Sequence, residues 1–239
     1  MRKQTRQLLV LPAIVAVVGG FFAGNAAGQA PERVKAQTVS LGIVSEINRT
    51  QIADHFSDFV RYVAANLAST SEIEGKVVIA PTPFQLAKLI EQKNVDFYME
   101  SPYPTYLVND VYGVAKLLLR RWKRGMAEYR SLIFTKKKGE INQLEDLRGK
   151  VLVFEDPDST SGYFLPKSFL MRKGFKFTDK SRFDLYASPT DIGYLFAYSQ
   201  EKLVDWVLTK KAAAGAFSND DYAKLDEKRK SDITILAET

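Results

Sequence analysis

In the stretch Asp156-Pro157-Asp158-Ser159-Thr160-Ser161-Gly162-Tyr163, three consecutive hydroxyl residues and a glycine follow two carboxylates. An apolar run before it, residues 151–154, predicts a strand, and residues 163–173 predict a helix. The first turn of a helix presents free N–H groups and the positive end of its dipole, and small residues let an anion approach them. Ser and Thr are also the ordinary N-cap residues. The residues alone therefore leave two interpretations open, a helix cap and an oxyanion-binding site.

The composition excludes several classes of function. The chain has 239 residues, 46% of them hydrophobic and 26% charged, which is typical of a soluble globular protein with one large or two small domains. It contains no cysteine, so disulfides, thiol catalysis and cysteine metal sites are excluded. Its one histidine, His55, lies in a helical pattern and argues against a histidine metal site or a Ser-His-Asp triad. The net charge of +6 is weak support for nucleic-acid binding.

The first thirty residues read as a targeting segment. Arg2, Lys3 and Arg6 precede an apolar run, residues 8–22, and small residues follow near 24–27. The run is short for a membrane-spanning helix, which needs about 20 apolar residues. We therefore predict that residues 1–30 are a secretory signal peptide, with an uncleaved N-terminal anchor as the alternative, and that the mature protein is periplasmic or otherwise extracytoplasmic.

The first half of the mature chain alternates apolar strands with helical patterns. The order strand, helix, strand, helix, strand predicts a parallel sheet with right-handed crossovers. The predicted strands are 38–44, 77–80 and 95–99, and the predicted helices are 52–67 and 82–92.

Two loops follow strands at the edge where parallel sheets bind ligands. One begins at Ser45, and the other, residues 100–105, presents Ser101 and Tyr103 between two prolines. These three residues are candidate ligand contacts. The alternative for the second loop is a proline-ordered turn in which Tyr103 packs sideways.

The second half predicts a further set of elements. Residues 114–120 and 129–136 are β-like and predict a hairpin or a crossing pair. Further strands are predicted at 151–154, 183–186, 214–217 and 232–236, and further helices at 142–147, 163–173, 188–208 and 222–230.

Four segments of this pattern occur together in one known family. They are Leu41-Gly42-Ile43-Val44-Ser45; residues 96–104, which end in Glu100-Ser101-Pro102-Tyr103-Pro104; residues 146–151 leading to Asp158-Ser159-Thr160-Ser161-Gly162-Tyr163; and Ala214-Gly215-Ala216-Phe217-Ser218. In these segments the chain resembles the phosphate/phosphite/phosphonate-binding proteins of bacterial ABC importers, which have the type II periplasmic-binding fold.

The resemblance implies an α/β fold of two lobes, with mostly parallel sheets and crossing hinge strands. It places the first lobe at 31–118, the second lobe with hinge strands at 119–231, and a returning hinge strand at 232–239. It implies that a small phosphorus oxyanion binds between the lobes, and that an ABC permease and ATPase receive it from a monomeric binding protein. The implied ligand contacts are Ser159, Thr160, Ser161, Gly162 and Tyr103, and Ser101 and Ser45 join them as candidates from the strand ends.

Two departures from the family pattern keep alternatives open. The residues before Ala214 are alanines, where the family often carries an acidic residue; Glu100 or Asp220 is a candidate substitute, so the three oxyanions are not ranked. The chain also ends soon after the last predicted strand, without the helices that complete the family's first lobe. The alternatives are therefore a sensing module without transport and a truncated, inactive paralogue.

We do not expect an enzyme, a cofactor or a metal. A hydrolase using Ser159 or Ser161 would need a base beside its nucleophile, and neither a histidine nor a Ser-x-x-Lys arrangement lies near these serines in the sequence.

Overall fold

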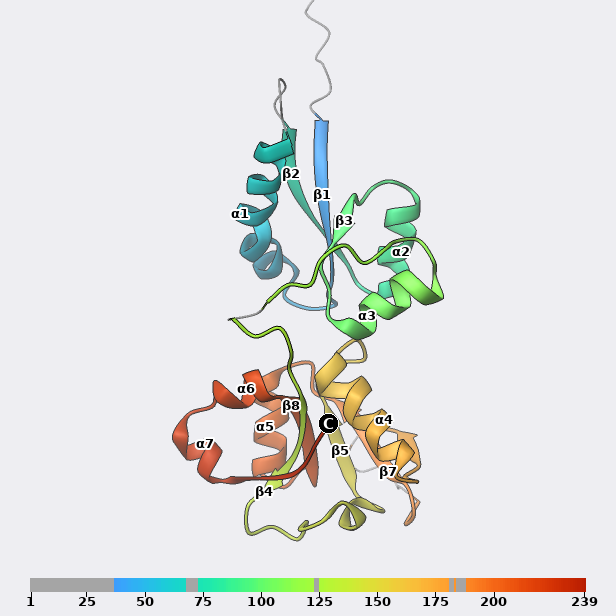
Figure 1. Ribbon diagram of the computed structural model, residues 1–239. Coiled ribbons are helices and arrows are strands. Elements are labelled where there is room, and N and C mark those ends of the chain that lie inside the picture. The colour runs from blue at the N-terminus through green and yellow to red at the C-terminus, as the bar shows by residue number, and fades with distance from the viewer. Residues whose placement is uncertain (1–36, 68–72, 123–124, 181–182, 184–187) are drawn as a thin grey trace, which may run out of the picture. The chain divides into compact units, whose positions relative to one another are not determined.

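The structure is a computed structural model that describes residues 37–67, 73–122, 125–180, 183 and 188–239 (Figure 1). The predicted signal segment lies outside these ranges. Within them, no helix is both long and apolar enough to cross a membrane.

The first sheet has three parallel strands in the order β2-β1-β3. Its strands are β1 (Gln37–Val44), β2 (Ile73–Ala80) and β3 (Phe97–Tyr98). Leu41 of the central strand lies opposite Val77 on one side and Phe97 on the other. The parallel sheet predicted from the alternating pattern is therefore confirmed.

Two helices cover the two faces of this sheet (Figure 1). Helix α1 (Arg49–Leu67) packs on one face through Val60 and Ala64, and α2 (Pro83–Glu91) packs on the other through Leu86. A Cβ atom at Gly42 would lie 2.5 Å from the Leu86 side chain, so glycine permits this close approach of helix and strand. Thr82 caps α2 by accepting the Gln85 N–H at 3.2 Å, so the helix begins where the range 82–92 placed it.

The second sheet has six strands in the order β6-β7-β5-β8-β4-β9. Strands β6, β7, β5 and β8 are parallel, and β4 is antiparallel to both β8 and β9. Their bounds are β4 Ser131–Lys136, β5 Val151–Phe154, β6 Phe177–Asp179, β7 Ile192–Phe196, β8 Ala214–Ser218 and β9 Ile233–Glu238.

Alternate residues of the central strands fill two cores, one on each face of this sheet. Leu152 and Phe154 of β5 pack with Leu170 of α4 (Leu165–Arg172), and Val153 packs with Leu203 of α5 (Gln200–Leu208). The remaining helical segments are α3 (Pro102–Tyr106), the π-helix η1 (Leu107–Val111), the 3₁₀-helix η2 (Leu144–Leu147), the π-helix η3 (Thr160–Phe164), α6 (Asn219–Ala223) and α7 (Glu227–Ser231).

Several predicted elements were wrong. The helix predicted at 188–208 is a strand, β7, followed by α5, because the run Ile-Gly-Tyr-Leu-Phe is buried between β6 and β5 and Ser199 caps a new helix. The hairpin is absent from the described residues, since 114–122 form no strand and only β4 forms near the second arm. The charged helix at 222–230 is two short helices, α6 and α7.

Two further predictions stay open. Most of the predicted strand at 183–186 lies outside the described residues. The last strand, β9, pairs with β4 at the edge of the second sheet, and the division of the chain into lobes and a returning hinge strand stays a prediction.

Candidate functional site

The hydroxyl stretch begins a helix, as predicted. Ser159 is the N-cap residue: its backbone is extended and its Oγ accepts the Gly162 N–H at 2.9 Å. Residues 160–164 then form a π-helical turn that continues directly into α4. Single π-helical turns joined to α-helices are frequent at functional sites. Ser159 is therefore a cap, which leaves Thr160 and Ser161 as the hydroxyls inside the first turn.

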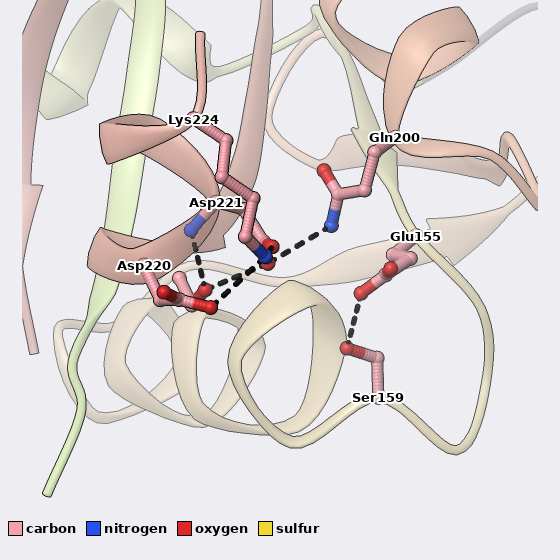
Figure 2. A network of polar contacts seen from close by, with 7 residues as sticks. Glu155, Ser159, Gln200, Asp220, Asp221 and Lys224 are labelled. Carbon is pink, nitrogen blue, oxygen red and sulfur yellow. Dashed lines mark hydrogen bonds and ion pairs between the residues drawn. The ribbon is translucent and has the colours of Figure 1, made fainter. Parts of the chain in front are cut away.

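Glu155 is the closest neighbour of this cap. Its Oε2 accepts a hydrogen bond from the Ser159 hydroxyl at 2.7 Å (Figure 2). A Cβ atom at Gly162 would lie 2.7 Å from both that carboxylate oxygen and Ser159 Oγ. Only glycine therefore lets the carboxylate and the cap sit so close to the backbone of the turn.

A polar network extends from this point along the ends of the second sheet's strands. Figure 2 shows Glu155 and Ser159 beside a second group centred on Asp221. Asp221 accepts hydrogen bonds from the Ser218 hydroxyl at 2.6 Å and from Gln200 at 3.4 Å, and its other oxygen pairs with Lys224 at 2.7 Å. These residues come from the end of β8, the start of α5 and helix α6, so the carboxyl ends of β5 and β8 share one polar surface.

Thr160 connects the hydroxyl stretch to the loop that follows β3. Its Oγ1 donates to Ser101 Oγ at 2.9 Å and accepts the Tyr103 N–H, also at 2.9 Å. The Tyr103 ring stacks on the Phe164 ring with centroids 4.3 Å apart and planes inclined by 9°. Three of the predicted site residues, Ser101, Tyr103 and Thr160, are therefore in direct contact.

Ser161 and Ser45, two other predicted site residues, make their hydrogen bonds outside this group of three. Ser161 is buried, and its carbonyl oxygen accepts a hydrogen bond from the Ser131 hydroxyl at 2.6 Å. Ser45 donates its hydroxyl to the Ile47 carbonyl at 2.6 Å. It lines a hollow of about 80 Å³ together with Glu46, Asp156 and Asp158. The structure therefore brings Ser45 beside the carboxylates at the start of the hydroxyl stretch.

A second hollow, of about 320 Å³, adjoins the first through Asp156 and Tyr198. Glu155 and Glu201 also line it. In the described part of the chain, no lysine, arginine or histidine lines either hollow. No group of His, Asp and Glu among the residues that the structure places is arranged to hold a metal ion.

Four carboxyl groups have raised pKa values: Glu155, Asp156 and Asp158, which line these hollows, and Glu100, which accepts the N–H of Val44. Burial raises the pKa of Glu100 to about 7. Two hydrogen bonds, from the backbone N–H groups of Val44 (2.6 Å) and Ser101 (3.3 Å), favour its charged form and offset part of this rise. Burial likewise raises the pKa of Asp156 and of Asp158 to about 6 each, and charged neighbours add to both shifts. Burial also raises the pKa of Glu155.

The raised pKa values affect how these carboxyl groups can meet a ligand. A fully charged set of carboxylates would repel an anion, but a carboxyl group that keeps its proton near neutral pH donates a hydrogen bond to one. The site therefore combines neutral hydroxyl donors with carboxyl groups that either donate or accept a proton, and it suits a ligand that exchanges protons with them.

Sequence reasoning missed three residues of this arrangement. They are Glu155, Phe164, and Tyr129, whose side chain is hydrogen-bonded to Thr160 and whose phenol pKa is raised by burial. Glu155 was accessible to the strand-end argument, because it directly follows β5. For Phe164 and Tyr129 the sequence held no signal, since their positions depend on tertiary packing. Glu100, considered as a substitute acid, does lie beside Ser101; Asp220, the other candidate, pairs with Lys224 at 2.9 Å.

Comparison with known proteins places this geometry in a family. The model of the family described as "ABC transporter, phosphonate, periplasmic substrate-binding protein" matches residues 41–239. A search of the curated proteins found none that matches.

Solved structures show the same fold. XAC2383 from Xanthomonas citri bound to chloride ion is 25% identical, with a TM-score of 0.77 over 84% of this chain and 73% of that chain. The same protein bound to ATP is also 25% identical, with a TM-score of 0.74 over 85% and 73%. PhnD1 from Prochlorococcus marinus (MIT 9301) in complex with methylphosphonate is 16% identical, with a TM-score of 0.61 over 85% and 72%.

These matches confirm the predicted type II periplasmic-binding fold and the predicted family. The family is periplasmic, and its members work with the permease and ATPase of an ABC transporter. The chain belongs to the periplasmic substrate-binding proteins of the ABC phosphonate transporter family.

Proposed function

We propose that this protein captures a small phosphorus oxyanion (a phosphonate, phosphite or phosphate) and delivers it to an ABC permease and ATPase. The proposed contacts are Ser159, Thr160, Ser161 and Gly162 from the hydroxyl stretch, with Ser101, Tyr103 and Ser45 from the strand-end loops. One observation carries the proposal: the Thr160 hydroxyl bonds both Ser101 and the Tyr103 N–H. A ligand oxygen taking the place of the Thr160 oxygen would accept hydrogen bonds from the Ser101 hydroxyl and the Tyr103 N–H, both in the loop that follows β3.

The carboxyl groups favour phosphorus over sulfur oxyanions. The Ser159 hydroxyl donates to Glu155, so it is available to a ligand only when Glu155 receives a proton from elsewhere. A singly protonated phosphonate, phosphite or phosphate carries a P–OH group that donates such a hydrogen bond. A sulfonate carries no proton at neutral pH. Either the Ser159 hydroxyl stays on Glu155 and is lost to the ligand, or it turns to the ligand and leaves the carboxylate without a donor, and each outcome costs affinity.

Isothermal titration of the mature chain tests this proposal. The ligands are methylphosphonate, phosphite, phosphate and methanesulfonate, with chloride and ATP included because related structures hold them. We expect heat from at least one phosphorus oxyanion and at least tenfold weaker binding of methanesulfonate, on the order of 1.4 kcal/mol or more. Absence of heat with every phosphorus oxyanion, from a folded sample, would refute the proposal.

A melting experiment and the identity of the neighbouring genes distinguish the two alternatives, an inactive paralogue and a sensing module. A chain that folds poorly and binds nothing would lack a cooperative melt that shifts upward with ligand. A sensing module without transport would bind ligand equally well, but its neighbouring genes would encode a kinase rather than a permease and ATPase. We further propose that the protein is a monomer and not an enzyme, and that residues 1–30 are removed on secretion; the mass of the mature chain tests the last point.

A further inference from the structure

The Tyr129 phenol lies beside the hydroxyl stretch, in the middle of the polar groups described above. Its side chain is hydrogen-bonded to the side chain of Thr160. Three carboxyl groups lie near enough for their charges to act on it: Glu155 after β5, Asp221 in α6 and Glu100 after β3. The phenol therefore lies where the loop after β3 meets the polar network of Figure 2.

The chain around Tyr129 is fixed against the hydroxyl stretch. The Arg130 N–H donates to the Asn219 side chain at 2.9 Å, and the Asn219 N–H donates to the Arg130 carbonyl at 3.0 Å. The antiparallel pairing of β4 with β8 thus extends one residue beyond Ser131, which is fully buried and donates its hydroxyl to the Ser161 carbonyl. Alternate residues of an extended chain point to the same side. The pairing therefore turns the Tyr129 side chain, like that of Ser131, toward the hydroxyl stretch.

The hydrogen bonds of the Thr160 hydroxyl show that the phenol is a donor. A hydroxyl has one proton to donate and two lone pairs that accept. The Thr160 proton goes to Ser101, and one lone pair accepts the Tyr103 N–H. The second lone pair is the position left for Tyr129, so the phenol donates to it. Burial raises the pKa of the Tyr129 phenol, and the charges of the nearby carboxyl groups add to this rise, so the phenol keeps its proton.

An oxyanion oxygen at the position of the Thr160 oxygen would use all three partners as donors. An unprotonated phosphoryl oxygen accepts a hydrogen bond on each of its lone pairs and donates none. The Tyr103 N–H and the Tyr129 O–H would donate as they do to Thr160, and the Ser101 hydroxyl would turn from accepting to donating. Hydrogen bonds to a charged acceptor are roughly twice as strong as those between neutral groups, so the exchange favours the ligand.

Tyr129 and Tyr103 differ in what they offer to the site. The Tyr103 ring stacks on Phe164, and Tyr103 reaches Thr160 through its backbone N–H. Tyr129 reaches Thr160 through its side chain and keeps 36% of its surface exposed, so a small solute has access to it. Tyr129 is therefore the tyrosine that brings a phenol to the position of the Thr160 oxygen.

We propose that Tyr129 is a ligand contact of the binding site, and that its phenol donates a hydrogen bond to the oxyanion oxygen that replaces the Thr160 oxygen. The inference rests on the proposed function, since it adds a residue to that same site. Tyr103 contributes its backbone N–H to the same ligand oxygen.

Isothermal titration of the full mature chain with methylphosphonate, phosphite and phosphate tests this inference. Tyr129→Phe keeps the ring and removes only the hydroxyl. We expect it to weaken binding of the tightest of these ligands by about ten- to a hundredfold, because one hydrogen bond to a charged group is lost. Tyr103→Phe should weaken binding less, because its N–H remains. Tyr62→Phe, at an exposed position on α1, is the control and should leave the affinity unchanged.

A second measurement follows the phenol without removing it. In a chain that carries fluorotyrosine at position 129, fluorine NMR reports the surroundings of the ring. We expect the resonance to move as methylphosphonate, phosphite or phosphate, whichever binds most tightly, saturates the site, because the acceptor of the phenol changes from a neutral hydroxyl to a charged oxygen.

The outcomes separate this inference from the proposed function. If the unsubstituted chain is folded and binds none of the three ligands, the proposed function fails. If it binds and Tyr129→Phe, shown to be folded by circular dichroism, binds within about threefold of it, only the inference about Tyr129 is overturned. A larger loss in Tyr103→Phe than in Tyr129→Phe would overturn it as well, and so would a fluorine resonance that saturating ligand leaves unmoved.

Discussion

The two sheets of this molecule bury their strands to different degrees. In the six-stranded sheet every residue of β8 is buried, as are five of the six residues of β4. In the three-stranded sheet the central strand β1 buries five of its eight residues, but Ala80 is the one buried residue of the edge strand β2, and the two-residue edge strand β3 is only partly buried. The second sheet therefore provides most of the packing, and the first provides a looser frame for the loop that carries Glu100, Ser101 and Tyr103.

The largest predicted effect compares one phenylalanine from each sheet. Phe134 of β4 is fully buried against Phe217, whereas Phe97 of β3 is partly buried. We expect Phe134→Ala to lower the free energy of unfolding by about 3–5 kcal/mol. Phe97→Ala should lower it by about 1–2 kcal/mol, because less apolar area is lost. Urea denaturation measures both losses, provided that the dependence of the unfolding free energy on urea concentration keeps the same slope in each variant. Equal losses of unfolding free energy in the two variants would contradict the difference between the sheets.

The next effect is the dependence of stability on pH through Glu100. Its pKa is raised from 4.5 to about 7 in the folded protein, so between these pH values the folded chain holds a proton that the unfolded chain has lost. The stabilising contribution of this proton is complete below pH 4.5 and disappears as the pH rises through 7. The full difference is on the order of 3 kcal/mol.

Glu100→Gln should therefore flatten the profile of unfolding free energy between pH 5 and pH 8. Asp96→Asn is the matched control, because Asp96 also accepts a backbone N–H of the first sheet, from Ser40 at 2.7 Å. That variant should lower stability and keep the slope that Glu100 causes. A slope that persists undiminished in Glu100→Gln would assign the pH dependence to Asp156 and Asp158 instead.

Two threonines separate binding from stability. Thr160→Val removes the hydroxyl that joins Ser101 and Tyr103, and Thr135→Val removes one that donates to the Ala213 carbonyl at 2.8 Å inside the second sheet. Each should lower the unfolding free energy by about 1–3 kcal/mol, since a buried polar group loses its partner. Only Thr160→Val should weaken binding of a phosphorus oxyanion, by about ten- to a hundredfold. Equal affinities in the two variants would remove Thr160 from the site.

Local patterns in the sequence predicted the parts of the fold that depend on neighbouring residues. The alternation of apolar runs and helical periods from Thr38 to Met99 was enough for the first sheet, and the cap at Ser159 followed from its residue type and position. Prediction from local patterns failed at Ile192–Phe196, which follows the residues Ser188-Pro189-Thr190-Asp191 that are typical of a helix start. This segment is a strand, because burial between β5 and β6 outweighed local preference. Such prediction failed again at 114–120, whose β-like composition has no partner strand within the described chain.

The candidate site shows the same division. The strand-end rule selected Ser45, Ser101 and Tyr103, and the position at a helix start selected the hydroxyl stretch. Contacts between residues 59 apart, such as Thr160 with Ser101, come from tertiary structure and have no local signal beyond a family resemblance. The raised pKa of Glu100 is similarly invisible in the sequence, since it depends on burial and not on the residues beside it.

The smallest effect concerns the ring stack between Tyr103 and Phe164, which joins the loop after β3 to the π-helical turn. A double-mutant cycle of Tyr103→Leu and Phe164→Leu isolates this contact from the area that each ring buries separately. We expect a coupling of about 0.5–1.5 kcal/mol in the free energy of unfolding, in the range of other aromatic pairs. The cycle for Phe134 and Phe217, stacked at 4.1 Å within the second sheet, is the matched comparison. If a bound oxyanion separates Tyr103 from Phe164, saturating ligand should reduce the first coupling and leave the second unchanged, because only the first involves the loop that carries ligand contacts.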